Sequence, residues 1–243
     1  MRILITNDDS ISSPVLLPLA KWAAKHGEVT VVVPKYEQSG KSHGIELHKP
    51  FEVVKVPDFV PGIEAYTVDS TPADCVRFAT EALRLNFDLV ISGINKGLNI
   101  GRDIVYSGTV GAILEAAYQG IPTSVALSTD PSDFSPALDH LDMVYDFFAE
   151  HDLLSKNNIY NVNIPLTCNG IRITRMGGPY YGDDFVEKEP NMFLPVGKPI
   201  FEKSGCEEID TDAVLVYNYI SITPLEVDRT KKAIFEELKE LNK

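Results

Sequence analysis

The first 130 residues alternate short runs of apolar, β-branched side chains with segments whose apolar residues recur at helical spacing. The predicted strands are residues 2–6, 29–33, 87–91 and 122–127, and the predicted helices are residues 14–25, 68–83 and 110–118. Gly27 and Gly120 are natural stops for two of these helices, and Ser70 or Thr71 before Pro72 is suited to cap the third. Such alternation is typical of an α/β fold with a parallel sheet and helices on both faces.

Beyond a soft boundary near residue 130 the pattern is less regular. The predicted strands there are residues 159–164, 171–175 and 219–223, and the predicted helices are residues 138–150 and 229–241. Residues 176–212 are rich in Gly, Pro and charged side chains. We expect them to form an extended hairpin or arm, because a long structureless loop is uncommon inside a compact domain.

The formal net charge of −13 restricts the partners of the chain. An acidic surface repels the phosphate backbone of nucleic acids, so we predict no DNA partner. A small phosphorylated substrate stays compatible with this charge, because a bound metal ion dominates its local field.

The cysteines and the N-terminus indicate a cytoplasmic protein. Cys75, Cys168 and Cys206 are isolated in sequence, which disfavours a disulfide framework or a zinc site. The N-terminal residues 1–9 have a strand pattern and do not resemble a signal peptide. No apolar run approaches membrane-spanning length, so we expect no membrane partner.

Candidate chemistry begins in the loop after the first strand, Asn7-Asp8-Asp9-Ser10. Two adjacent carboxylates repel one another unless a cation neutralises them. Oxygen ligands of this kind suit Mg²⁺, Mn²⁺ or Ca²⁺ better than zinc. The alternative is that Asp8 or Asp9 caps a helix that begins near Ser12.

A second polar loop, residues 34–44, follows the strand at 29–33. Ser39 offers a hydroxyl to a metal or a phosphate, and Lys41 offers positive charge. His43 lies outside any apolar stripe and is a candidate proton carrier near neutral pH. A solvated surface turn would explain the same residues.

A third loop, residues 92–103, alternates glycines and asparagines directly after a buried strand. Such a loop can expose backbone N–H groups to an anion. Ser107, Gly108 and Thr109 then open a helix, whose N-terminus favours phosphate. The spacing matches neither a Walker loop nor GxGxxG. The alternative is a glycine-rich turn with Thr109 as an ordinary helix cap.

Five segments occur together in one order: ILITNDD, PKYEQSGKSH, VDSTPADCVRFA, DLVISGINKGLNIGRDIVYSGTVGA and YISITPL. With them the chain resembles the SurE family, the stationary-phase survival proteins that act as metal-dependent 5′-nucleotidases. The matching segments run from residue 3 to residue 225 and cover nearly the whole chain.

The resemblance implies that one divalent ion per subunit, Mg²⁺ or Mn²⁺ (Ca²⁺ in a crystal), is held by four residues: Asp8, Asp9, Ser39 and Asn95. It places the substrate phosphate near Asn95, Ser107, Gly108 and Thr109. It also implies a Rossmann-like catalytic portion over residues 1–130. The remaining portion, residues 131–243, would serve oligomerisation by exchanging elements between the subunits of a dimer or tetramer.

Three positions depart from the family pattern, because Ser10, Val15 and Ala116 stand where glycine is usual. If the family glycines near the metal loop use positive φ, Val15 would be strained. For Ser10 we expect a local hydrogen bond from its hydroxyl that stabilises the turn.

We therefore predict a phosphomonoesterase that converts nucleoside 5′-monophosphates to nucleoside and phosphate. The predicted catalytic residues are Asp8, His43 and Asn95. Asp8 or His43 would serve as base for water, or Asp8 would attack as a covalent nucleophile. One alternative is a non-catalytic nucleotide-binding or regulatory protein with a weakened metal site. Another is a metal-dependent deacetylase, which is disfavoured because only His43 and His48 lie near the site as zinc ligands.

Overall fold

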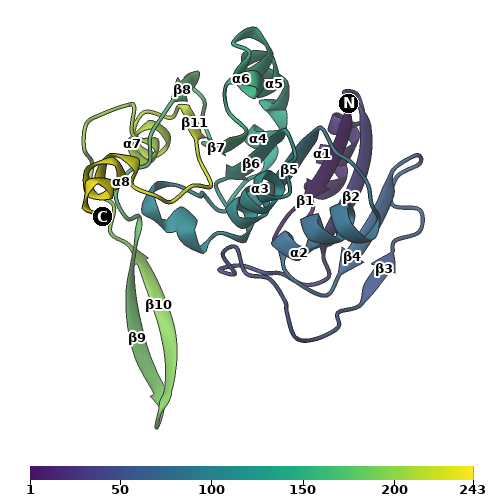
Figure 1. The fold of residues 1–243 in the computed structure, drawn as a ribbon, viewed down its shortest axis with the longest axis horizontal. Helices are drawn as coiled ribbons and strands as arrows, with labels where there is room; N and C mark the ends of the chain where they lie inside the picture. The colour runs from purple at the N-terminus through teal and green to yellow at the C-terminus, as the bar shows by residue number, and fades with distance from the viewer. Residues whose placement is uncertain (243) are drawn as a thin grey trace.

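The computed structural model describes residues 1–242 and shows a large twisted sheet with helices on both faces (Figure 1). Nine strands form this sheet, in the order β3-β4-β2-β1-β5-β6-β7-β11-β8, and a separate two-stranded hairpin projects from one end of the molecule (Figure 1). The strands are β1 Arg2–Thr6, β2 Glu28–Pro34, β3 Val53–Lys55, β4 Glu64–Val68, β5 Leu89–Lys96, β6 Thr123–Thr129, β7 Ile159–Ile164, β8 Ile171–Ile173, β9 Tyr181–Glu189, β10 Met192–Pro199 and β11 Ile220–Pro224.

The α-helices are α1 Leu16–Ala23, α2 Pro72–Arg77, α3 Gly108–Tyr118, α4 Ser135–Asp139, α5 Leu141–Glu150, α6 Leu153–Lys156, α7 Asp210–Leu215 and α8 Lys232–Leu238. Short 3₁₀ helices span Gly101–Tyr106 and Lys239–Leu241. Within residues 1–242, none of the helices has the length and apolarity that a membrane crossing requires.

The central strands β4-β2-β1-β5-β6-β7 are all parallel. Numbered along the chain, they have the order 3-2-1-4-5-6 of a doubly wound Rossmann sheet. The direction of winding reverses between β1 and β5, which are neighbours in the sheet. In such sheets ligands bind in the crevice beyond the carboxyl ends of these two strands.

The two faces of the sheet are covered by different helices. Ile3 and Ile5 of β1 belong to an apolar cluster that also contains buried residues of α1 and α5. Leu4, which points to the opposite face, belongs to a cluster with buried residues of α2 and α3. Because strands buried on both faces must be apolar throughout, β1 reads as a continuous hydrophobic run. Each of these buried side chains contributes roughly 1.5–3 kcal/mol of transfer free energy.

The α/β prediction is confirmed, and most elements fall within a few residues of their expected bounds. The structure adds β3 and β4, which the sequence pattern did not reveal. The helix expected over residues 68–83 is shorter than predicted: it begins at Pro72, with Thr71 Oγ1 accepting from the Asp74 N–H. It changes to a π-helical turn at Phe78–Ala82, and Val68 belongs to β4.

In the second half, β7, β11 and β8 extend the same sheet past residue 130. The expected arm is the β9–β10 hairpin, but residues 210–212 of that stretch belong to α7. The Asp210 carboxylate accepts hydrogen bonds from three backbone N–H groups, those of Gly101, Gly177 and Thr211. These bonds attach the C-terminal end of the 176–212 stretch to the main body of the protein. The helix expected over 138–150 is divided into α4 and α5.

Candidate active site at the switch point

Asp8 lies two residues after the end of β1 at the switch point of the sheet, and only 4% of its surface is exposed. The Thr109 hydroxyl donates to Asp8 Oδ1 at 2.6 Å. Burial raises the pKa of Asp8 to about 6; the Thr109 hydrogen bond opposes this shift and the charge of Asp9 adds to it. The carboxyl group is therefore costly to ionise without a nearby cation.

Asp9 is anchored to the end of the neighbouring strand, because the Lys96 backbone N–H donates to Asp9 Oδ2 at 2.9 Å. Burial raises the pKa of Asp9, the hydrogen bond and charge of Lys96 oppose this shift, and the charge of Glu37 adds to it. When both aspartates are ionised, the surrounding hydrogen bonds and positive charges therefore do not fully offset their negative charge.

Asn95 comes from the end of β5, and its side-chain amide donates to the Gly97 carbonyl at 2.8 Å. The loop that follows is held by a group of buried amides. Asn99 donates through its backbone N–H to Asn163 Oδ1, and its carbonyl accepts from the side chains of Asn161 and Asn163. Sequence reasoning missed these two β7 asparagines. Their signal is an alternating pair of amides within an otherwise apolar strand.

Several of the predicted site residues meet at a cavity of about 520 Å³, whose lining does not include Asp9, Gly108 or Thr109. Its lining includes four predicted site residues, Asp8, Ser39, Asn95 and Ser107. Lys96 and Arg102 add positive charge to the lining, and Tyr106 and Tyr181 add aromatic surface.

The N-terminus of α3 lies against Asp8. A Cβ atom added to Gly108 would lie 3.2 Å from Asp8 Cβ and 3.3 Å from Asp8 Oδ2, so this glycine lets the helix approach the carboxylate closely. Ser107 caps the helix by accepting from the Val110 N–H at 3.1 Å. Gly108 and Thr109 therefore border the site beside Ser107, where the positive end of the helix dipole favours an anion.

The donor set fits a hard divalent cation. The side-chain contacts given above engage Asp8 Oδ1, Asp9 Oδ2 and the amide nitrogen of Asn95, so the second carboxylate oxygen of each aspartate and the amide oxygen of Asn95 stand outside those contacts. Ser39 Oγ donates to Glu37 Oε1 and keeps its lone pairs. Carboxylate, amide and hydroxyl oxygens are ligands that Mg²⁺ and Mn²⁺ accept.

Ser10 adopts a left-handed backbone conformation with φ of 72°, the geometry that glycine adopts without strain. Its Oγ lies 2.8 Å from Ser12 Oγ and accepts from the Ser12 N–H at 3.3 Å, which is the local stabilisation that we expected. Val15 has φ of −92°, so the expected strain at this residue is absent. Ala116 is buried on the face of α3 that packs against the sheet.

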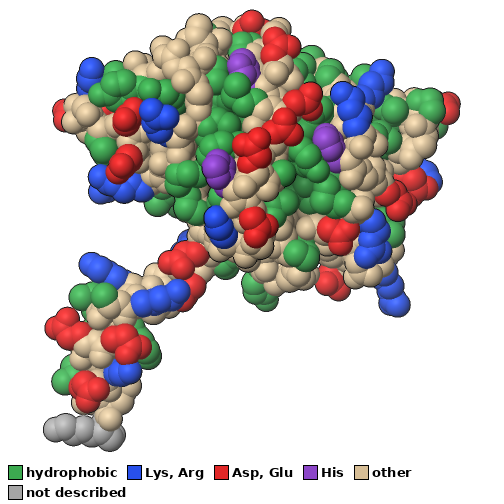
Figure 2. Space-filling model, turned by 90° about the horizontal axis from the view of Figure 1, so that it is seen from above, with side chains coloured by type: hydrophobic (Ala, Val, Ile, Leu, Met, Phe, Trp, Pro, Cys, Tyr) green, Lys and Arg blue, Asp and Glu red, His purple; other side chains and the backbone are tan. Residues whose placement is uncertain are grey.

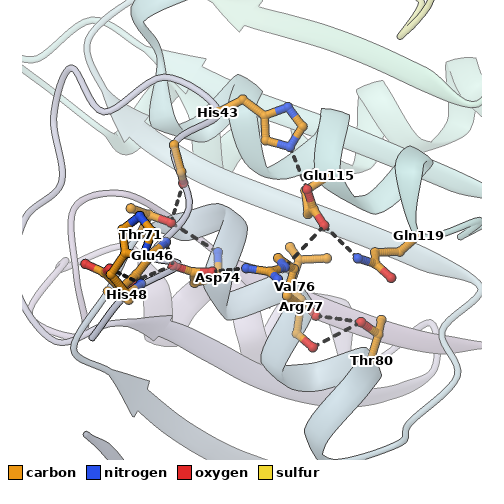
Figure 3. Close-up of polar contacts among 12 residues, drawn as sticks. His43, Glu46, His48, Thr71, Asp74, Val76, Arg77, Thr80, Glu115 and Gln119 are labelled. Atoms are coloured by element: carbon orange, nitrogen blue, oxygen red, sulfur yellow. Dashed lines mark hydrogen bonds and ion pairs between the residues drawn. The ribbon is translucent and has the colours of Figure 1, made fainter. Parts of the chain in front are cut away.

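The structure does not bring His43 into this cavity. Its Nε2 lies 2.6 Å from Glu115 Oε2 on α3, and its side chain lines a neighbouring cavity of about 570 Å³. Figure 3 shows the imidazole directed at Glu115. This placement does not favour His43 as the base for a reaction at Asp8.

Comparison with known proteins decides the family, since the model of the survival protein SurE matches residues 3–183. The chain belongs to the SurE family. It is 37% identical to the 5′-nucleotidase SurE of Clostridium beijerinckii over 98% of both chains. It is 38% identical to that of Alkaliphilus metalliredigens, covering 100% of this chain and 99% of the relative. The crystal structure of the SurE protein from Aquifex aeolicus superposes with a TM-score of 0.79 at 30% identity, over the full length of both chains.

Proposed function

We propose that this SurE chain is a metal-dependent 5′-nucleotidase that hydrolyses nucleoside 5′-monophosphates to nucleoside and phosphate. Curated relatives of this name are 36–39% identical to it over at least 95% of its length. The observation that carries the proposal is a pair of adjacent carboxyl groups with raised pKa values, buried Asp8 and half-buried Asp9, of which Asp8 lines the cavity and lies against the N-terminus of α3.

The proposed metal ligands are Asp8, Asp9, Ser39 and Asn95, for one Mg²⁺ or Mn²⁺ ion per subunit. A divalent ion bound there would polarise a phosphoryl oxygen and offset the charge that develops during hydrolysis.

The chain itself binds and orients the substrate phosphate. Ser107, Gly108 and Thr109 present the N-terminus of α3 to the phosphoryl oxygens, and Asn95 contributes its side chain from the opposite strand. Asp8 accepts from the Thr109 hydroxyl at this helix end, and besides its contact with the metal it would either take a proton from water or attack phosphorus as a nucleophile.

The nucleoside would occupy the outer part of the cavity. Tyr106 and Tyr181 are 59% and 48% exposed and line it, which offers flat surfaces for a base. Arg102 adds positive charge next to the phosphate position. We therefore expect nucleotides to be better substrates than sugar phosphates of similar charge.

For assembly we propose a dimer or tetramer, with the metal and phosphate ligands in residues 1–130 and the subunit contacts in residues 131–243. The β9–β10 hairpin is exposed along its length, with Phe185 at 63% and Phe193 at 59%. No residue of α8 is buried, and the C-terminal segment projects from the body (Figure 2). An isolated two-stranded hairpin is marginally stable in water, so a partner subunit is the expected support.

An activity assay tests the proposed function. Chelator-treated protein should be inactive, and added Mn²⁺ or Mg²⁺ should restore hydrolysis of nucleoside 5′-monophosphates in a panel that includes sugar phosphates. Asp8→Asn should remove activity, while the exposed Asp58→Asn, the same chemical change elsewhere, should leave it intact. Full turnover after chelation, or in Asp8→Asn, would contradict the proposal.

A further inference from the structure

The loop that carries Ser39 is fixed at three places. At its start the Gln38 N–H donates to the Asp8 carbonyl at 2.8 Å. Further along, Ser42 donates to two carbonyls at the end of the 3₁₀ helix, through its N–H to Tyr106 and through its hydroxyl to Val105. The third anchor is the contact between His43 and Glu115.

Glu115 is 4% exposed and lies on the third turn of α3. Burial acts to raise its pKa, but hydrogen bonds from His43 and Gln119 and the charges of His43 and Arg77 outweigh burial, so the pKa is lowered overall. Gln119 donates to Glu115 Oε1 at 2.7 Å, and Arg77 Nε lies 4.0 Å from the same oxygen. The carboxylate is therefore ionised at neutral pH and satisfied by three neighbours (Figure 3).

An ionised carboxylate only accepts hydrogen bonds, which means that His43 Nε2 carries a proton and donates it to Glu115. Nε2 therefore has no lone pair for general-base catalysis, and a neutral His43 keeps a lone pair only on Nδ1. The imidazole also lines the cavity beside α3, while Asp8 lines the other one.

Further hydrogen bonds connect the residues after His43 to α2. Thr71 Oγ1 donates to the Gly44 carbonyl at 2.7 Å, and the Glu46 N–H donates to Asp74 Oδ2 at 2.8 Å. Asp74 also accepts from Arg77 Nη1 at 2.7 Å. The chain of contacts from Asp74 through Arg77 to Glu115 and His43 thus ties the loop to two helices (Figure 3).

We propose that His43 is a positioning residue: its Nε2–H bond to Glu115 clamps residues 38–44 onto α3 and so holds Ser39 at the cavity that contains Asp8 and Asn95. The proposal rests on the proposed function only in taking Ser39 as a metal ligand. It assigns His43 no contact with substrate and no proton transfer in the reaction.

The test compares His43→Gln with His43→Ala in the full chain. Gln keeps an N–H donor at a similar distance from the backbone, so it should hold the clamp, whereas Ala cannot. We expect Mn²⁺ affinity, measured by titration of the metal-free protein, to stay within about threefold in His43→Gln. In His43→Ala it should fall by about tenfold or more, as for other residues that orient metal ligands. His48→Ala, in the adjoining loop, is the matched control and should match wild type.

Three results would overturn the clamp. One is unchanged Mn²⁺ affinity in His43→Ala. Another is a loss of turnover in His43→Gln equal to that in His43→Ala with metal affinity intact, which would identify His43 as a base. The third is additive losses of metal affinity in His43→Ala and Glu115→Gln, because residues that act through one contact must give a non-additive double variant. Thermal denaturation of each variant identifies any that fail to fold. If His43→Ala fails to fold, the comparison of His43→Gln with wild type still tests the proposal.

The two proposals fail in different ways. If wild-type protein shows no 5′-nucleotidase activity and Mn²⁺ affinity still depends on His43 as described, the proposed function is wrong and the clamp stands. If nucleotides are hydrolysed and metal affinity is indifferent to His43, the clamp is wrong and the proposed function stands.

Discussion

Ser10 combines a strained backbone with a compensating side-chain contact. A non-glycine residue at φ of 72° costs about 1 kcal/mol or more, and its hydroxyl contacts recover a similar amount. Ser10→Gly removes both terms, so we expect a stability change within about 1 kcal/mol. Ser10→Ala keeps the strain and loses the contacts, so it should destabilise the fold by about 1–2 kcal/mol.

Denaturant unfolding measures these changes, and steady-state kinetics should show turnover within a few-fold of wild type in both Ser10 variants. If Ser10→Ala abolished turnover in a folded protein, the hydroxyl would instead have to contact the reacting groups.

The raised pKa of Asp8 makes the stability of the metal-free protein depend on pH. The favourable contribution of the protonated group is fully present below pH 3.8 and is lost as pH rises through about 6. The shift corresponds to about 3 kcal/mol between these limits. Asp8→Asn removes this dependence, so the variant should be more stable than metal-free wild type at pH 7, with a smaller difference at pH 4. Thermal unfolding curves at both pH values, recorded with chelator, provide the measurement; an equal difference at the two values would refute it.

At the scale of elements, the first turn of α3 is shaped by the loop that crosses it. Alanine in a helix is normally favoured over glycine by about 1 kcal/mol. At Gly111, however, an added Cβ would lie 2.3 Å from the Ser42 carbonyl oxygen. Because overpacking costs about 1–3 kcal/mol and the loop must move, Gly111→Ala should lower both the melting temperature and Mn²⁺ affinity.

The matched control for this variant is Gly178→Ala, whose added Cβ meets no atom within 4 Å. It should change the melting temperature little. If Gly111→Ala raised the melting temperature and left Mn²⁺ affinity normal, the loop that contains Ser42 would be able to move away without disturbing the metal site.

The sequence predicts elements best where burial alone decides them. β1 and β7 have the bounds that their apolar residues indicate, because strands covered on both faces are rich in such residues, although β7 also contains Asn161 and Asn163. β3 escapes prediction because it is an edge strand of only three residues, Val53–Lys55, too short to give an apolar run. β4, Glu64–Val68, escapes because its apolar residues are separated by Tyr66 and Thr67. α7 escapes because its position depends on hydrogen bonds that the Asp210 carboxylate accepts, one of them from the distant backbone N–H of Gly101.

The candidate site divides in the same way into residues that the sequence places and residues that only the fold places. The paired aspartates and the glycine-rich loop are contiguous in sequence and follow strands whose order places them side by side, so their convergence is predictable. The orientation of His43 is not, since it depends on Glu115 lying 72 residues away on a helix whose rotation the local pattern does not fix.

At the scale of the whole molecule, the exposed arm predicts self-association. Light scattering at micromolar concentration should give the mass of a dimer or tetramer. Phe185→Ser combined with Phe193→Ser should shift the mass toward the monomer, because it removes apolar surface that a partner would cover. Tyr118→Ser, at a 74% exposed position on α3, is the control and should leave the mass unchanged. A wild-type monomer would contradict the proposed assembly.

The contacts at the base of the β9–β10 hairpin affect how the enzymatic rate depends on protein concentration. Tyr181 and Asp183 line the cavity, and the backbone N–H groups of Tyr180 and Tyr181 both donate to Asp103, two residues past the glycine that opens the 3₁₀ helix. A change in how the arm is held by a neighbouring subunit is therefore transmitted to the wall of the site. If the arm is held only in the assembly, specific activity will decline on dilution and will recover slowly on reconcentration, so rates measured at nanomolar enzyme will understate those at the concentrations where the subunits remain together.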